Sequence, residues 1–383
     1  MLSVECFLRQ NYHIILLNIP IANIAMTCQA TNNRPHRPCP SATERKVLRW
    51  LRAEGSELRT LYREADRVRR KHVGDAVYLR GLIEFSNICK NSCLYCGINR
   101  TNRTIQRYRM KPEEIISQCG RALEQGCTTV VLQSGEDPWF TCGRLCRIIR
   151  KIKNKYPLAI TLSIGERFPD ELLEMRRAGA DRYLLRFETS DTKLFARLHP
   201  DSALKQRLAC LEAIRKAGFQ PGSGFMIGLP ASDLKTMARD IIFATRLRLD
   251  MIGCGPFIAH PDTPLANKPL LAERELYFKT IAILRLLNPW AHIPATTAFD
   301  AMAPGSRDRL LTMGANVIMP NLTPTRYRRL YMLYPNKPCV DEDDTRCGAC
   351  LKRRLAVLKR PIGTDFGHGW SASKSEGRMQ NEE

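Results

Sequence analysis

The feature that most constrains the fold of this 383-residue chain is a regular alternation of short apolar runs with amphipathic segments. The apolar runs are typical of buried strands, and the segments between them carry the period of helices that pack on one face. Three of these segments run up to Gly126, Gly179 and Gly218, and glycine is typical of the position that ends a helix. The candidate strands are residues 76–85, 128–133, 158–164, 181–187, 222–229, 250–257, 291–298 and 315–320.

Eight strand-and-helix units are the number that a closed (β/α)8 barrel requires. We therefore predict an α/β chain with a TIM-type barrel over residues 44–330, and an open doubly wound sheet is the alternative. In such barrels the chemistry lies on the loops that follow the strands. The residues after the candidate strands, such as 86–96 and 134–137, are indeed more polar than the strands themselves.

The regions outside the barrel differ from it in composition. Residues 1–43 contain no acidic residue after Glu5, so we predict an N-terminal extension that is disordered, a targeting presequence, or sequence upstream of a start at Met26. The stretch PSATER predicts the start of a helical segment over residues 41–71, with Ser41 as its N-cap. Residues 331–369 read as an irregular tail with a short basic helix, and residues 370–383 as disordered.

The net charge of +22 favours acidic partners, but the basic residues are spread along the chain without a dense block. We interpret most of them as solvated helix faces and expect no nucleic-acid partner. No window has the ~20 apolar residues of a membrane span, so we expect no membrane contact. We further expect a monomer that is located in the cytoplasm, or in an organellar matrix if a presequence is present. Five of the 15 cysteines fall in apolar or helical stretches and are interpreted as buried small side chains in a reducing compartment, namely Cys119, Cys127, Cys146, Cys210 and Cys254.

Three cysteines form a separate group in the loop after the first candidate strand. Cys89, Cys93 and Cys96 have the spacing C-x3-C-x2-C. Three thiolates can hold a 4Fe-4S cluster through three of its irons and leave the fourth iron open to another ligand. A structural zinc site or an ordinary ferredoxin would use four protein ligands, which makes these alternatives weaker.

The sequence C-x3-C-x-aromatic-C after a first barrel strand resembles the radical S-adenosylmethionine (SAM) superfamily. The segments RGLIEFSNICKNSCLYCGI, IGCGPFIAHPDTPLAN and GANVIMPNLTPTRYRRLYMLYPNK resemble HydE-type FeFe-hydrogenase maturases, over residues 54–360. The resemblance implies that SAM binds the open iron and is cleaved to a 5′-deoxyadenosyl radical. It further implies that the radical acts on the sulfur of a cysteine-bound iron carbonyl-cyanide complex, to assemble the di-iron subcluster of the hydrogenase.

The resemblance also implies which residues contact SAM. The departures from the family pattern are Ser134 in place of a glycine and Phe187 in place of a histidine. Tyr95 corresponds to a residue that lies against the adenine, with ordinary packing as the alternative, and Arg207 could instead be a solvated base. The implied SAM contacts are Tyr95, Ser134, Gly135, Glu136, Glu188 and Arg207.

A second set of residues resembles the pocket in which the family binds its anionic substrate. Arg182 and Arg186 are four apart and would lie on one face of a strand. Two inward cations are costly unless an anion meets them, although internal carboxylates could do so too. The implied substrate contacts are Thr161, Arg182, Arg186, Met251, Thr296, Thr297, Tyr331 and Tyr334.

The tail carries a further cysteine group, Cys339, Cys347 and Cys350, spaced C-x7-C-x2-C. It resembles a variable accessory site of the family, which suggests a possible second iron-sulfur cluster without a catalytic role. A zinc site completed by His368 is the alternative.

The resemblance implies three partners: a tyrosine-cleaving radical SAM maturase that supplies the substrate, a GTPase maturase that acts as scaffold, and an electron donor such as ferredoxin or flavodoxin. Two other functions stay open. One is a sister radical SAM enzyme, either a methylornithine synthase-like mutase or a biotin synthase-like enzyme that inserts sulfur. The other is an iron-sulfur or zinc protein that binds nucleic acid without catalysis.

Overall fold

The computed structural model describes residues 43–268, 274–341 and 344–369. The predicted N-terminal extension, up to residue 42, and the predicted disordered tail 370–383 lie outside the described residues. No helix in the described part of the chain is long and apolar enough to cross a membrane.

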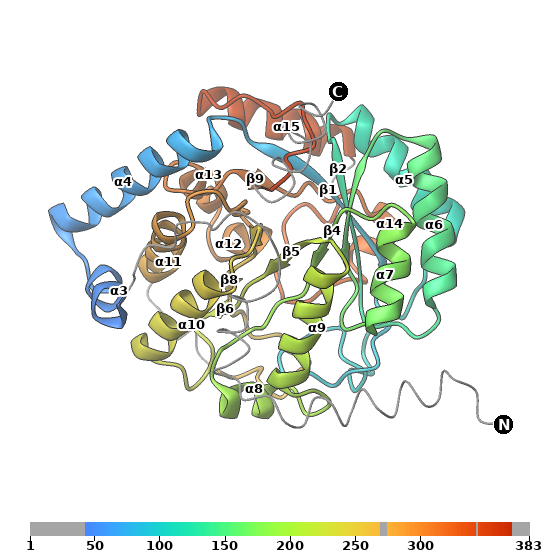
Figure 1. The fold of residues 1–383 in the computed structure, drawn as a ribbon, viewed down its shortest axis with the longest axis horizontal. Helices are drawn as coiled ribbons and strands as arrows, with labels where there is room; N and C mark the ends of the chain where they lie inside the picture. Colours follow the sequence, from blue (N-terminus) through green and yellow to red (C-terminus); the bar gives the residue numbers. More distant parts are fainter. Residues whose placement is uncertain (1–42, 269–273, 342–343, 370–383) are drawn as a thin grey trace.

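Seven parallel strands form the central sheet, in the order β7-β5-β4-β3-β2-β1-β9, and helices surround them (Figure 1). A second, smaller sheet pairs β6 (Met226–Ile227) with β8 (Gly255–Pro256), also in parallel. The seven strands are β1 (Tyr78–Ser86), β2 (Thr129–Ser134), β3 (Ala159–Ser163), β4 (Arg182–Leu184), β5 (Gln220–Ser223), β7 (Met251–Ile252) and β9 (Val317–Ile318).

The sheet closes through a segment that is not itself a strand. His292 bridges Met251 of β7, and Pro294 bridges Val317 of β9, so the two edges of the sheet are joined. The predicted strand 291–298 is therefore wrong beyond these two bridges, because Pro294 has no N–H for a longer ladder and a helix begins at Thr297. The predicted TIM-type barrel is confirmed.

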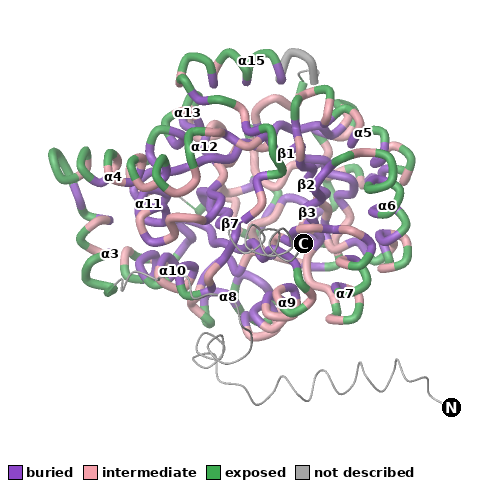
Figure 2. The backbone as a smooth tube through the Cα atoms, turned by 45° about the horizontal axis from the view of Figure 1, so that its top comes forward, coloured by how far each residue is buried: buried purple, intermediate pink, exposed green. Residues whose placement is uncertain are grey.

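The helices of the barrel lie outside the strands and bury their inner faces, as Figure 2 shows by the purple interior and the green periphery. Gly126, Gly179 and Gly218 follow helices with φ of 79°, 110° and 88°, a region that favours glycine, which confirms the three predicted helix ends. The main outer helices are α5 (Pro112–Glu124), α6 (Cys142–Lys155), α7 (Pro169–Arg177), α8 (Thr192–Leu198), α9 (Leu204–Lys216), α10 (Leu234–Arg246) and α11 (Arg274–Leu287). Shorter ones are α12 (Thr297–Met302), α13 (Ser306–Leu311) and α14 (Thr325–Arg328).

The predicted N-terminal helix is two helices, α3 (Glu44–Leu51) and α4 (Gly55–Val73). The N-cap is Thr43, whose hydroxyl accepts from the Lys46 amide at 3.3 Å. The prediction of Ser41 as the cap falls outside the described residues.

The end of the predicted tail packs against the barrel at the amino ends of its strands. After α15 (Asp344–Val357), Ile362 bridges Val77 just before β1. The Arg182 guanidinium donates to the carbonyl of Phe366 at 2.6 Å. We call residues 362–369 the floor segment, because they close the barrel at the amino ends of the strands.

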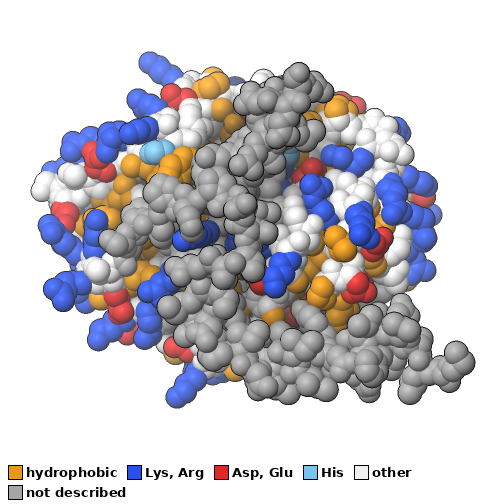
Figure 3. All heavy atoms as spheres, viewed as in Figure 1, with side chains coloured by type: hydrophobic (Ala, Val, Ile, Leu, Met, Phe, Trp, Pro, Cys, Tyr) orange, Lys and Arg blue, Asp and Glu red, His pale blue; other side chains and the backbone are white. Residues whose placement is uncertain are grey.

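The charged side chains are dispersed over the surface. On the described part of the face in Figure 3, Lys and Arg are scattered among Asp and Glu, as the sequence predicted.

Candidate active site

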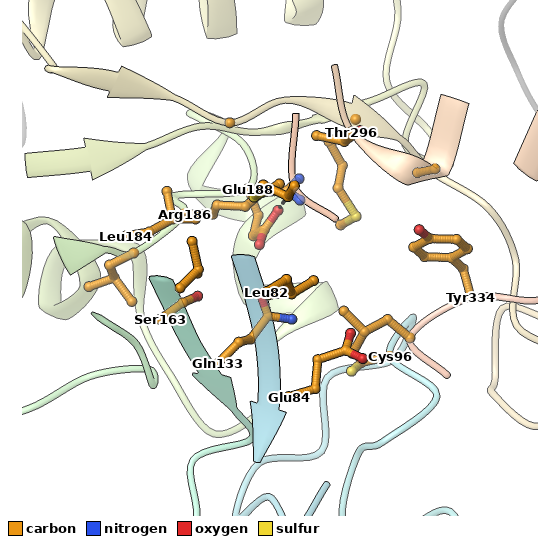
Figure 4. A pocket seen from close by; sticks show the side chains of 18 of the residues that line it. Leu82, Glu84, Cys96, Gln133, Ser163, Leu184, Arg186, Glu188, Thr296 and Tyr334 are labelled. Atoms are coloured by element: carbon orange, nitrogen blue, oxygen red, sulfur yellow. Dashed lines mark ion pairs between the residues drawn. The ribbon is translucent and has the colours of Figure 1, made fainter. Parts of the chain in front are cut away.

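A cavity of about 360 Å³ occupies the barrel interior and reaches the carboxyl ends of the strands (Figure 4). It collects the residues predicted for the cluster, for SAM and for the substrate, with one exception. Arg182 does not line it. The predicted residues that do are Cys89, Cys93, Tyr95, Cys96, Ser134, Gly135, Glu136, Thr161, Arg186, Glu188, Arg207, Met251, Thr296, Thr297, Tyr331 and Tyr334.

The three clustered cysteines lie together at this cavity as free, half-buried thiols. Burial, together with the charge of the neighbouring thiolates, raises the pKa of Cys93 above its ordinary range and that of Cys96 to about 12. Three thiols that resist ionisation and suppress one another's ionisation suit a cationic iron centre, which stabilises all three thiolates at once. The donor set therefore fits a 4Fe-4S cluster bound by three cysteines.

The end of β2 approaches the cysteine loop closely at Gly135. A Cβ atom on this residue would lie 2.3 Å from the Ile88 carbonyl oxygen and 2.9 Å from the Cys89 Cβ, so only glycine fits. Its neighbour Ser134 uses its hydroxyl on the Gly135 carbonyl oxygen at 2.7 Å, and Glu136 pairs with Lys90 at 3.2 Å. The loop after β2 is thus fixed against the predicted cluster site.

Asp137 is a residue of this loop that the sequence analysis missed. Its buried carboxylate accepts two hydrogen bonds from the Arg109 guanidinium, at 2.6 and 2.9 Å, and one from the Ser86 hydroxyl at 2.7 Å. Burial raises the pKa of Asp137, but the bonds from Arg109 and Ser86 outweigh burial and leave it below its ordinary value. The carboxylate therefore ties the end of β1 to the loop after β2.

Glu188 stands two residues past Arg186, at the end of a segment that leaves β4. Its φ of 63° is unusual for a residue with a side chain, and such strain is typical of functional sites. The Glu188 carboxylate lies 2.9 Å from the Arg186 guanidinium. Figure 4 shows the pair on one side of the cavity and Tyr334 on the other.

Arg207 is buried, so the alternative that it is a solvated base is wrong. Its Nε donates to Glu166 at 2.6 Å and its Nη1 to the Arg186 carbonyl oxygen at 2.8 Å. Burial lowers the pKa of Arg207, but the Glu166 carboxylate more than offsets burial and leaves it above its ordinary value. Glu166 is a second missed residue, and its position in the polar loop after β3 was the available signal.

Arg182 lies beneath the cavity rather than on its wall. Besides Phe366, its guanidinium contacts the carbonyl of Gly367 at 3.1 Å and Nδ1 of His368 at 3.0 Å. Because β4 ends at Leu184, the strand alternation does not carry Arg182 and Arg186 to a common environment. The sequence analysis also allowed an internal carboxylate to meet these arginines. This alternative holds for Arg186, whose guanidinium pairs with the Glu188 carboxylate.

Some polar atoms of residues that line the cavity have no hydrogen-bond partner in the described part of the chain. The Nε of buried Arg80 and the hydroxyls of Thr161 and Thr296 have no hydrogen-bond partner among the described residues. Arg80 was missed, although an arginine within the apolar run AVYLRGLIEF is a visible signal. The other two nitrogens of the Arg80 guanidinium contact Met251 Sδ at 2.9 Å and the Gly367 carbonyl oxygen at 3.2 Å. One guanidinium N–H and two hydroxyls that are buried without partners are costly by themselves and suit a guest that accepts hydrogen bonds.

A buried ion pair forms another part of the cavity wall. Lys337 lies 2.5 Å from one Glu84 carboxylate oxygen and 2.6 Å from the other. Tyr331 is fully buried next to it, with its ring centroid 5.4 Å from the lysine nitrogen. The Tyr334 hydroxyl is 2.8 Å from that of Thr297. The pair therefore anchors the segment that brings both predicted tyrosines to the cavity.

The accessory cysteine site stays a prediction. Cys339 is half-buried with a φ of 61°, Cys350 is exposed, and the side chain of Cys347 is not described. Among the described side chains, no three His, Cys, Asp or Glu residues stand close enough to hold a single metal ion, and this applies to the cysteine loop as well as to the tail. His368, proposed for the zinc alternative, instead contacts Arg182 and Gln220 in the barrel floor, the latter at 2.8 Å.

Comparison with known proteins shows which family the chain belongs to. Residues 83–243 match the model of the radical SAM superfamily. The chain is 47% identical over 308 residues to the [FeFe] hydrogenase maturase subunit HydE of Thermotoga maritima, covering 80% of this chain and 88% of that protein.

Two solved structures share the fold. Methylornithine synthase (PylB) superposes with a TM-score of 0.74 at 28% identity, over 84% of this chain and 94% of that one. The FeFe-hydrogenase maturase HydG from Carboxydothermus hydrogenoformans gives a TM-score of 0.72 at 21% identity, over 83% and 75% of the two chains. Membership in the superfamily implies a 4Fe-4S cluster and SAM, which the cysteine loop and its cavity fit. The chain therefore belongs to the radical SAM superfamily and, within it, to the HydE family.

Proposed function

We propose that this enzyme matures FeFe-hydrogenase by acting on the sulfur of a cysteine-bound iron carbonyl-cyanide complex, in the assembly of the di-iron subcluster. The observation that carries the proposal is the 47% identity to Thermotoga maritima HydE, over 88% of that protein. When bound, the 4Fe-4S cluster and SAM supply the 5′-deoxyadenosyl radical.

The residues of the cavity would divide this work between its two ends. Cys89, Cys93 and Cys96 would hold the cluster. Glu188 suits the SAM amino group or ribose, and Arg207, kept charged by Glu166 at 2.6 Å, suits the SAM carboxylate. The remaining predicted contacts on the SAM side are Tyr95, Ser134, Gly135 and Glu136.

The deep end of the cavity supports an anionic substrate. The Arg80 Nε and the hydroxyls of Thr161 and Thr296 offer three hydrogen-bond donors in a buried setting. Leu82, Met251 and other apolar side chains line the same cavity and would shield a reactive intermediate from water. A volume of about 360 Å³ is within the usual range for a small ligand.

We further propose that the enzyme works in a sequence of partners. A tyrosine-cleaving radical SAM maturase would supply the iron-cysteine complex, and a GTPase maturase would receive the product as scaffold. Ferredoxin or flavodoxin would supply the electron that the cluster needs. A second cluster at Cys339, Cys347 and Cys350 would be accessory to this work.

The test is anaerobic reconstitution of the enzyme with iron, sulfide, SAM, a reductant and the iron-cysteine complex, followed by product analysis and hydrogenase maturation. We expect 5′-deoxyadenosine, consumption of the complex and active hydrogenase. A Cys96→Ser variant should yield none of these, and Cys142→Ser, which changes a half-buried cysteine on α6, should behave as the parent. An enzyme that cleaves SAM but never consumes the complex would contradict the proposed substrate.

A mutase acting on an amino acid is the second candidate, favoured by the superposition with methylornithine synthase. The same reconstituted enzyme incubated with lysine would form an isomer if this were correct. The lower identity, 28% against 47%, makes the maturase the stronger candidate.

A further inference from the structure

The cysteine loop rests along Leu198–Asp201, which comprise the last residue of α8 and the first three residues of its connection to α9, and which we call the bracket. The Leu94 amide donates to the Leu198 carbonyl oxygen at 3.0 Å. The amide and the hydroxyl of Ser92 both lie 2.5 Å from the same carboxylate oxygen of Asp201. The bracket therefore holds the loop at two points, on either side of Cys93.

A third contact joins the bracket to the cavity itself. The Tyr95 hydroxyl lies 2.9 Å from Nε2 of His199, with the two rings edge to face at 5.4 Å. The other ring nitrogen of His199, Nδ1, is 3.0 Å from the carbonyl oxygen of Phe195. A carbonyl can only accept, so Nδ1 carries the proton and Nε2 accepts from the Tyr95 hydroxyl.

The orientation of His199 is set by residues outside the cysteine loop. Its ring stacks on Phe195 with centroids 4.1 Å apart and an interplanar angle of 19°. The Arg207 guanidinium lies 5.6 Å from the same phenylalanine ring. His199 is 2% exposed and lines the cavity together with Tyr95 and Arg207. It thus stands between two of the residues predicted to contact SAM.

We propose that His199 is a positioning residue of the SAM site, which fixes the Tyr95 ring against the cavity through the bond from the tyrosine hydroxyl to Nε2. The bond restricts the rotation of Tyr95 about its side-chain torsions, so the ring presents the same face whenever SAM enters. This inference rests on the proposed function only in requiring that the enzyme bind SAM. It is independent of the substrate.

The test measures the SAM dissociation constant of the anaerobically reconstituted full chain, from the change that SAM makes in the electron paramagnetic resonance signal of the reduced cluster. His199→Phe removes the acceptor and keeps a ring that can stack on Phe195. We expect SAM affinity to fall about three- to tenfold at unchanged iron content. His199→Gln replaces Nε2 with an amide oxygen of similar reach and should restore most of the affinity. His72→Phe, on the remote helix α4, is the control and should match the parent.

Two results would overturn the inference: a His199→Phe variant that binds SAM as the parent does, or a Gln variant as weak as the Phe variant. If His199→Phe failed to take up iron, Tyr95→Phe would decide, because it removes the other half of the bond and keeps the ring. It should weaken SAM binding to the same degree, and the double variant should be no weaker than either single one. Normal SAM binding without hydrogenase maturation would count against the proposed substrate alone.

Discussion

The Arg186 guanidinium and the Glu188 carboxylate lie 2.9 Å apart on the cavity wall, where they join the two sets of residues predicted for the substrate and for SAM. Arg186 is 30% exposed at its side chain and Glu188 only 11%. The charge of Arg186, which is predicted to contact the anionic substrate, is therefore already in contact with a carboxylate of the SAM side. A change at Arg186 should be felt at both ends of the cavity, though unequally.

We predict that Arg186→Met abolishes most maturation while SAM cleavage without substrate persists. Losing a charge-assisted hydrogen bond in a dry site costs roughly 1.5–3 kcal/mol, so substrate binding should weaken by about one to two orders of magnitude. The affinity for SAM should fall by less than tenfold, because Glu188 stays in place and loses only its neighbour. The two activities are measured on one preparation. A parallel loss of both, with an altered iron-sulfur spectrum, would assign Arg186 to the SAM site instead.

A second prediction concerns the close approach at Gly135. In Gly135→Ala the new methyl group would lie 2.3 Å from the Ile88 carbonyl oxygen, and since that atom belongs to the backbone, the cysteine loop has to shift. We expect reduced cluster loading, measured as iron content and visible absorbance after reconstitution. Gly143→Ala is the matched control, because the nearest atom to its added methyl group is 4.0 Å away. Equal iron content in the two variants would show that the loop tolerates the displacement.

The sequence predicted the barrel and the polar loops after its strands, because both depend on local patterns. The periods of the apolar residues marked the strands, and helix ends were visible at residues such as Gly126. The predicted strands were too long wherever the run of apolar residues continued beyond the residues that pair with a neighbouring strand. Residues 250–257 form β7 and β8 rather than one strand, with an interruption at Gly253, whose backbone approaches Gly224 closely.

In the candidate site, the sequence could predict only those residues that belong to a local motif. Glu166, His199 and Lys337 each act through a partner that is distant in the sequence, namely Arg207, Tyr95 and Glu84. No local pattern records such pairs, because they arise only when the barrel closes and the tail returns to it. Arg182 shows the converse error. Its spacing suggested an inward cation, but the floor segment meets it with backbone carbonyls.

A third prediction tests the buried pair of Glu84 and Lys337. Lys337→Met leaves the Glu84 carboxylate buried, at 2% exposure, without its cation. Removing one partner of such a pair costs about 3–5 kcal/mol, so the midpoint of thermal unfolding should fall clearly. Arg329→Met is the control in the same segment, because its pair with Asp341 is 70% and 62% exposed at the two side chains and should contribute little. Similar midpoints for the two variants would contradict the role given to the buried pair.

The last prediction is that the stability of the fold depends on pH through Asp240, which holds the loop just after Glu188. The buried carboxylate of Asp240, on α10, accepts from the amide and the hydroxyl of Ser190, both at 2.6 Å. Burial raises the pKa of Asp240 from 3.8 to about 6, although the bonds from Ser190 act in the opposite direction. The folded protein therefore holds this proton more tightly than the unfolded chain. The stabilisation is fully present below pH 3.8 and is lost as the pH rises through 6.

Between pH 5 and pH 7.5 this carboxyl should lower the free energy of unfolding by about 1.4 kcal/mol. Asp240→Asn has no proton to lose, so its unfolding temperature should fall less than that of the parent over the same pH interval. Asp170→Asn, which changes an exposed carboxyl on α7, is the control and should keep the parent's pH dependence. An Asn variant that loses as much stability as the parent between the two pH values would show that Asp240 is ionised throughout. The loop at Ser190 would then be held by a charged carboxylate at every pH in the interval.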